Sequence, residues 1–303
     1  MPRDLRIFPL LEVSRAELDA LVEWPIASVE PLQGGFSNTL HRVVLVDGRV
    51  LVVKHYAGGS KTYRDELATL TRLAGVLPVP EVLRTDANRR AIAYRWIDGF
   101  TLDECRRGEP PAAFASLADP LGRLFAWIAR TEPLDAADRW EVAPLLAQVR
   151  VQLVDSRARE RMGGPLADAL ARAFEASSDR LAWGPQCLCH HDIGGRNMIV
   201  QRADGDRWRI GGVIDWEAAG TGSPLVDIGS LFRFAPRYDE KFRAEFERGY
   251  READGALPDD WYRTSRLLDA LRLIDTLDEG RELPGVFADC RMLLAKLVAD
   301  LAA

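Results

Sequence analysis

The sequence of 303 residues is poor in cysteine and has no long apolar run. No stretch approaches the roughly 20 apolar residues that a membrane-spanning helix needs, so we expect no membrane partner. The N-terminus lacks the apolar segment of a secretory signal, which predicts a cytoplasmic location. Of the four cysteines, Cys187 and Cys189 form a C-x-C rather than the C-x-x-C of zinc and redox motifs. We interpret both as small hydrophobic residues on or near a buried strand.

A surplus of positive charge is also missing. The formal net charge is −6, which argues against nucleic acid as a partner because nucleic-acid-binding proteins usually carry a basic face. From Val226 to the C-terminus, 16 acidic residues stand against 12 basic ones. Such an excess is typical of a solvated helical surface, although an acidic pocket for a cationic substrate would show it too.

The order of apolar patterns predicts an α+β protein with two lobes. Short runs rich in Val, Ile and Leu predict strands, with a hairpin at Asp47-Gly48 and one helix that ends at Gly75. After residue 98 the patterns become mostly helical, with one β-rich island. We therefore expect a small antiparallel β lobe over residues 1–98 and a larger helical lobe over 99–303. The expected strands are 26–33, 39–46, 50–56, 81–84 and 91–96, the expected helices are 61–73, 114–130, 143–159, 166–181, 238–251, 261–277 and 286–301, and the island is 187–216.

The strongest chemical signal is the stretch CHHDIGGRNMIV at residues 189–200. It contains the pattern H-x-D-x-x-x-x-N, formed by His190, Asp192 and Asn197, and runs into an apolar strand. Asp215 follows in the segment VIDWE. Phosphoryl transfer needs an aspartate that orients the attacking hydroxyl, and an Asn and a second Asp that hold Mg²⁺ against the nucleotide phosphates. These residue types therefore favour a kinase.

Two features of the β region fit the same chemistry. Lys54 ends an apolar strand, where a lysine normally has no reason to be. The segment QGGFSN places Gly34 and Gly35 between two strands, followed by Ser37 and Asn38. Glycines let backbone N–H groups approach phosphates closely, although a Gly-Gly pair is also a common hairpin turn. No G-K-[ST] follows, so the segment is not a Walker loop.

With HHDIGGRN, GVIDWEAAGTGSPLVDIG and the strand lysine, the chain resembles the aminoglycoside phosphotransferase and choline kinase superfamily, which shares the protein kinase fold. The resemblance extends from about Val29 to the C-terminal helices. It implies that ATP or GTP is the co-substrate and that Mg²⁺ is the cofactor. The family loop is usually closer to H-G-D, so His191 and Gly194-Gly195 are departures that leave the substrate class open.

The resemblance also implies a role for each matching position. Asp192 is implied to be the catalytic base, with His190 a structural member of the catalytic loop and Asp227 its brace. Asn197 and Asp215 are the implied Mg²⁺ ligands. The remaining residues are implied to serve the nucleotide: Lys54 on the phosphates, Glu66 as its helix partner, Gly34, Gly35, Ser37 and Asn38 as the phosphate loop, and Arg95, Trp96 and Ile97 at the hinge against the purine, where Trp96 is equally compatible with inter-lobe core.

Other functions compete with this one. A metal hydrolase at His190-His191-Asp192 would need further ligands, and the other two histidines lie far along the chain. A regulatory pseudokinase would usually lack one of the key positions, all of which are present. A protein kinase would need a longer segment between Asp215 and Asp227 for docking a peptide.

We therefore predict a small-molecule kinase that is a monomer or a homodimer. The acidic C-terminal quarter favours an aminoglycoside-like or other amine-bearing acceptor, and a neutral sugar or another metabolite is the alternative. Candidate pocket residues are Asp227, Arg233, Tyr238, Trp261, Asp269 and Asp275.

Overall fold

A computed structural model of the protein describes residues 8–32, 37–108, 111–135, 137–203 and 207–302. The chain forms two compact units, Met1–Pro110 with Gly195–Ala219, and Pro111–Gly194 with Gly220–Ala303. The sequence predicts a nucleotide-binding lobe over 1–98 and a catalytic lobe over 99–303, and this functional division remains a prediction. Residues 195–219 pack with the first unit although they lie within the expected second lobe.

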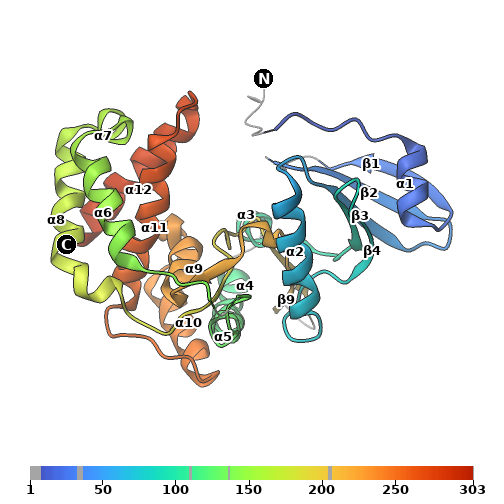
Figure 1. Ribbon diagram of the computed structural model, residues 1–303. Coiled ribbons are helices and arrows are strands. Elements are labelled where there is room, and N and C mark those ends of the chain that lie inside the picture. Colours follow the sequence, from blue (N-terminus) through green and yellow to red (C-terminus); the bar gives the residue numbers. More distant parts are fainter. Residues whose placement is uncertain (1–7, 33–36, 109–110, 136, 204–206, 303) are drawn as a thin grey trace. The chain divides into compact units, whose positions relative to one another are not determined.

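The first unit contains a five-stranded antiparallel sheet (Figure 1). Its strands are β1 (Ile26–Pro31), β2 (Thr39–Leu45), β3 (Val50–His55), β4 (Val82–Asp86) and β5 (Ala91–Arg95), in the order β1-β2-β3-β5-β4. β2 and β3 form the expected hairpin, and Gly48 supplies the positive φ of +88° that its turn requires. Lys54 thus lies on the central strand of the sheet.

Two helices cover the two faces of this sheet. α2 (Ser60–Leu73) packs Tyr63 against the face that carries Val52 and Ile92. α1 (Arg15–Val22) packs Leu18 and its neighbours against the opposite face. Because side chains alternate along a strand, Lys54 shares the face of Val52 and points toward α2.

Helix α1 is an element that the sequence patterns did not predict. Its N-terminus carries a capping box, in which the Ser14 hydroxyl accepts from the Glu17 N–H and the Glu17 carboxylate accepts from the Ser14 N–H. The spacing S-x-x-E before an apolar residue was the signal that would have found it.

A second, smaller sheet belongs to the same unit. It contains β6 (Phe100–Thr101), β8 (Met198–Arg202) and β9 (Trp208–Val213), and α3 (Leu102–Gly108) follows β6 directly. β8 and β9 pair antiparallel, with Met198 opposite Val213. The short helix η1 (Trp216–Ala218) comes after β9 and contacts α2.

The second unit is mostly helical. Helices α6, α7, α8, α11 and α12 lie side by side in Figure 1, while α5 packs against α10 and α9 against α11. One short antiparallel pair, β7 with β10, adjoins them, and β7 carries the buried Cys187 and Cys189 as expected. The bounds are α4 (Pro111–Ala115), α5 (Ala118–Ala129), α6 (Val142–Val154), α7 (Arg157–Met162), α8 (Gly164–Leu181), β7 (Cys187–Cys189), β10 (Gly220–Gly222), α9 (Pro224–Leu231), η2 (Phe232–Arg237), α10 (Glu240–Glu252), α11 (Trp261–Asp278) and α12 (Pro284–Ala302).

Within the described ranges, none of the helices is both long enough and apolar enough to cross a bilayer.

The buried His55, next to the half-buried His41, gives the first unit a predictable pH dependence. His55, 4% exposed, has no hydrogen-bond partner for its Nδ1 among the described residues. Burial, followed by the His41 ring at 6.3 Å between centroids, lowers the pKa of His55 from 6.5 to about 4. Below pH 6.5 the unfolded chain binds a proton that the folded chain binds only near pH 4. The free energy of unfolding should therefore fall through this window as the pH drops, by at most about 3 kcal/mol.

Denaturant unfolding at about pH 7 and about pH 5 checks this expectation. His55→Leu removes the titrating group, so the variant should lose less stability than the wild type between the two values. Equal losses in the two proteins would contradict the assigned shift.

Candidate active site

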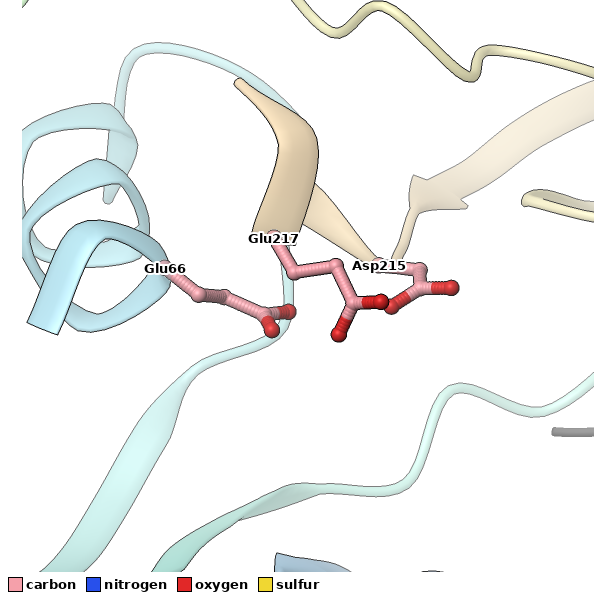
Figure 2. Close-up of side chains that lie close together, drawn as sticks. All are labelled: Glu66, Asp215 and Glu217. Atoms are coloured by element: carbon pink, nitrogen blue, oxygen red, sulfur yellow. The ribbon is translucent and has the colours of Figure 1, made fainter. Parts of the chain in front are cut away.

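Four charged side chains meet at the centre of the first unit. The Lys54 ammonium lies 2.6 Å from Glu66 Oε2, 2.5 Å from Asp215 Oδ1 and 3.1 Å from Glu217 Oε2. Figure 2 shows Glu66 reaching in from α2 and the other two carboxylates from the segment around η1. The structure thus pairs Lys54 with Glu66, as the resemblance implies, and brings Asp215 to the same ammonium from 161 residues away.

Hydrogen bonds fix Glu66 in this cluster. Its Oε2 also accepts from Tyr56 Oη at 2.7 Å, and its Oε1 accepts from the Trp216 N–H at 3.2 Å. Both carboxylate oxygens are therefore occupied, and the buried charge is satisfied as burial requires. This arrangement holds the lysine at a defined place beneath the sheet.

The electrostatic balance of the cluster is negative. Burial alone would lower the pKa of Lys54, but the carboxylates of Asp215 and Glu66 outweigh it and hold the pKa well above its ordinary value. Burial raises the pKa of Glu217, and the nearby Asp215 adds to the rise. One ammonium faces three carboxylates whose oxygens lie within 4.8 Å of one another. Up to two negative charges remain to be balanced.

Strand pairing places Asn197 beside Asp215. Asn197 directly precedes β8 and Asp215 follows β9, and the Ile214 N–H donates to the Asn197 carbonyl at 2.9 Å. Asp215 itself has a φ of +66°, a left-handed conformation that is uncommon for a residue other than glycine. The strained backbone turns the chain sharply between β9 and η1. Oxygen donors of this kind suit a hard cation such as Mg²⁺, so the residues present fit the implied metal.

The predicted phosphate loop is described only in part. Gly34 and Gly35 lie outside the described residues. Asn38 is buried, and its side-chain amide donates a hydrogen bond to the Glu217 carboxylate. Ser37 is half-buried beside it. The end of the loop is thereby tied to the carboxylate cluster.

The predicted hinge follows β5. The Arg95 N–H donates to the Glu81 carbonyl at 2.9 Å and the Trp96 N–H to the Val50 carbonyl at 3.0 Å. Both amides are therefore used within the sheet, and the Trp96 ring packs against the core of the first unit. The Ile97 amide makes no hydrogen bond with a described residue. Ile97 is thus the one of the three whose N–H can meet a purine edge.

The loop that carries Asp192 belongs to the second unit. Asp227 accepts from the His190 N–H at 2.7 Å and from the His191 N–H at 2.9 Å, so both its oxygens hold the loop backbone. These are the contacts that a bracing residue would make. The ring of the buried His190 accepts from the Asp192 N–H through Nδ1 at 3.2 Å. His191 has a φ of +62° and its Nε2 lies 3.2 Å from the Thr221 carbonyl oxygen.

The other acidic candidates for the acceptor pocket are engaged with neighbours. The Asp269 carboxylate accepts from Arg233 at both oxygens, with Nη2 at 2.7 Å from Oδ1 and Nε at 3.0 Å from Oδ2. Asp275 Oδ1 accepts from Gln148 at 3.0 Å and from Gln152 at 2.8 Å. Two further candidates, Tyr238 and Trp261, are buried in an aromatic cluster around Phe232.

Sequence reasoning missed two residues of the site. Glu217 stands in the VIDWE segment, but only its contacts with Lys54 and Asn38 reveal that it joins the cluster. Arg272 lies in the middle of α11, and its Nη2 is 3.9 Å from Asp192 Oδ1. An arginine on a helical surface carries no sequence signal that would have distinguished it from a solvated charge.

Comparisons with known proteins bear on the family and the fold of this chain. A sequence model of the phosphotransferase enzyme family (APH) matches residues 28–266. The GDP and kanamycin complex of APH(2")-IIia is 18% identical with a TM-score of 0.71, covering 91% of this chain and 94% of that one. Choline kinase LicA from Streptococcus pneumoniae is 15% identical with a TM-score of 0.66, and the match covers 94% of this chain and 97% of that one. Macrolide 2'-phosphotransferase MphH from Brachybacterium faecium is 18% identical with a TM-score of 0.65, and the match covers 88% of this chain and 92% of that one.

These likenesses confirm the predicted kinase-like α+β fold. None of the curated proteins matches the sequence significantly.

Proposed function

This chain belongs to the phosphotransferase enzyme family, and from that premise we propose that it transfers the γ-phosphoryl group of ATP or GTP to a hydroxyl of a small molecule. Membership makes the chain an enzyme with an alcohol group as acceptor, as the motifs predict. The observation that carries the choice of a nucleoside triphosphate is the buried Lys54 with its partners Glu66 and Asp215. An ammonium fixed in this way can stabilise the negative charge of the nucleotide phosphates.

The residues divide the work between binding and transfer. Lys54 binds the nucleotide phosphates, and the Ile97 amide binds the purine edge. Asn197 and Asp215, with Glu217 beside them, would hold Mg²⁺, which supplies charge neutralisation on the phosphates when bound. Asp227 and His190 keep the loop of Asp192 in one conformation through the contacts described above.

Asp192 orients the acceptor for attack. Its carboxylate accepts the hydroxyl proton while the hydroxyl oxygen forms a bond to the γ-phosphorus and the bond from that phosphorus to the β–γ bridging oxygen breaks. The products are a phosphate monoester and a nucleoside diphosphate. Most of the acceleration comes from positioning and electrostatic stabilisation, because the transition state is loose and needs little covalent help from the protein.

Nucleoside diphosphate release tests this function directly. We expect release from ATP or GTP that depends on Mg²⁺ and is stimulated by at least one class in a panel of antibiotics, amino-alcohols and sugars. The panel also separates the amine-bearing acceptor, favoured by the acidic C-terminal quarter, from a neutral sugar. Tight nucleotide binding without release over the whole panel would instead support a regulatory, non-catalytic protein.

A further inference from the structure

An arginine forms a long ion pair with the proposed catalytic base but no hydrogen bond to it. Arg272 Nη2 is 3.9 Å from Asp192 Oδ1, too far for a hydrogen bond, and both residues belong to the second unit. The Arg272 side chain is 52% exposed, whereas that of Asp192 is 20% exposed. The Arg272 guanidinium donates no hydrogen bond to any residue in the described part of the chain. Its planar set of N–H donors is therefore free for a ligand.

The acidic residues of the same unit that the sequence singled out already accept hydrogen bonds from neighbours. Asp227 holds the backbone of the catalytic loop, Asp269 holds Arg233, and Asp275 accepts from two glutamines. A cationic acceptor would have to share oxygens already in use at Asp227 and Asp269, whereas Asp275 is exposed and accepts both glutamines through Oδ1 alone. The structure places the Arg272 guanidinium 3.9 Å from Asp192 Oδ1.

We propose that Arg272 binds a carboxylate of the acceptor while Asp192 binds its hydroxyl. A hydroxyl that donates to Asp192 lies about 2.7 Å from the accepting oxygen, and the guanidinium nitrogen lies 3.9 Å from Asp192 Oδ1. A carboxylate a few bonds from the reacting hydroxyl thus falls within reach of Arg272. Guanidinium donors match a carboxylate in a two-bonded geometry, which gives orientation as well as affinity.

This substrate class rests on the proposed function, because the transfer step defines which hydroxyl is meant. A hydroxy acid meets the requirement, and an amino-alcohol that also carries a carboxylate meets it equally. A cation without an acid group does not. Arg272 is then a specificity-determining residue.

A purely structural role for Arg272 predicts a different pattern. If the guanidinium only balanced the charge of Asp192, its loss would change kcat for every acceptor alike. If it binds a carboxylate, its loss raises KM for acids and leaves neutral acceptors unaffected. Arg263 provides the matched control, because it is an exposed arginine on the same helix. It lies nine positions earlier and so faces about half a turn away.

The experiment compares acceptors that differ only in the acid group: glycerate with glycerol, serine with serinol, and gluconate with sorbitol. Binding is measured by calorimetry and transfer by nucleoside diphosphate release, on the wild type, Arg272→Ala, Arg272→Lys and Arg263→Ala. We expect at least one acid to bind about tenfold or more tightly than its neutral partner, because one charge-assisted contact contributes about that much affinity. Arg272→Ala should remove that preference, Arg272→Lys should keep part of it, and Arg263→Ala should keep it all.

Two results overturn the assignment of Arg272. One is that no acid in the panel binds more tightly than its neutral partner. The other is a preference for acids that survives in Arg272→Ala. Failure of the proposed function is distinguishable from both, because it would show as an absence of Mg²⁺-dependent nucleotide turnover with every acceptor and with water.

Discussion

Replacing Asp192 with asparagine is expected to lower kcat by about 10²–10⁴-fold, the range for loss of a positioned general base. Asparagine keeps the size and most of the hydrogen bonding of the side chain but cannot accept the hydroxyl proton. Nucleotide affinity should change little, because the nucleotide contacts are assigned to Lys54, Asn197 and Asp215. Steady-state kinetics with a calorimetric nucleotide titration separates the two effects.

Asp179→Asn provides the control for this substitution. Asp179 is an exposed aspartate on α8, and the same chemical change there should leave kcat and nucleotide affinity unaltered. A near-normal kcat in Asp192→Asn would remove Asp192 from the reaction. A large loss of nucleotide affinity would assign it to binding instead.

Replacing Lys54 with methionine is expected to destabilise the protein by about 3–5 kcal/mol, the range for removing one partner of a buried ion pair. The loss arises because Glu66, with its side chain only 2% exposed, is left buried beside two other carboxylates. Nucleotide binding should weaken strongly in the same variant, since the ammonium is assigned to the phosphates. Denaturant unfolding and a nucleotide titration report the two effects separately.

Two further variants make this prediction sharper. Adding Glu66→Gln to Lys54→Met removes the orphaned charge, while the amide oxygen can still accept from Tyr56, so the double variant should regain stability over Lys54→Met. Lys61→Met breaks the exposed pair between Lys61 and Asp65 on α2 and should cost less than about 1 kcal/mol. If Lys54→Met proved as harmless as Lys61→Met, the buried cluster would not be the electrostatic centre of the first unit.

Local sequence patterns predict much of the fold because turns, strands and helix ends depend on residues that are close together in the sequence. The Asp47-Gly48 turn, the strand that carries Lys54 and the helix that stops before Gly75 all lie where the sequence patterns predict them. Helices α1, α3 and α9 are not among the expected helices; the apolar face of α1 is short, and its capping box was the stronger signal. The β-rich island at 187–216 was expected as one piece, but β7 belongs to the second unit and β8 and β9 to the first. The local sequence does not predict which other strand a short strand pairs with.

The candidate site was predictable in so far as its residues stand in motifs. Lys54 pairs with Glu66 as the resemblance implies, and Asp215 meets the same lysine from a distant part of the chain. Glu217 joins them through the Asn38 amide, a contact across 179 residues that only the folded chain creates. Arg272 likewise approaches Asp192 through the packing of the helical unit. Tertiary contacts place such residues in the site, and no spacing in the sequence predicts those contacts.

The central claim is that the γ-phosphoryl group moves to an acceptor hydroxyl that Asp192 orients. The most direct measurement follows label from ATP or GTP carrying a radioactive γ-phosphate into the acceptor, in the wild type and in Asp192→Asn, with α-labelled nucleotide alongside. We predict that γ-label enters an acid-stable phosphate monoester in the wild type, that Asp192→Asn nearly abolishes this transfer while still binding nucleotide, and that α-label never transfers. Equal transfer of γ-label by the wild type and Asp192→Asn would contradict the account.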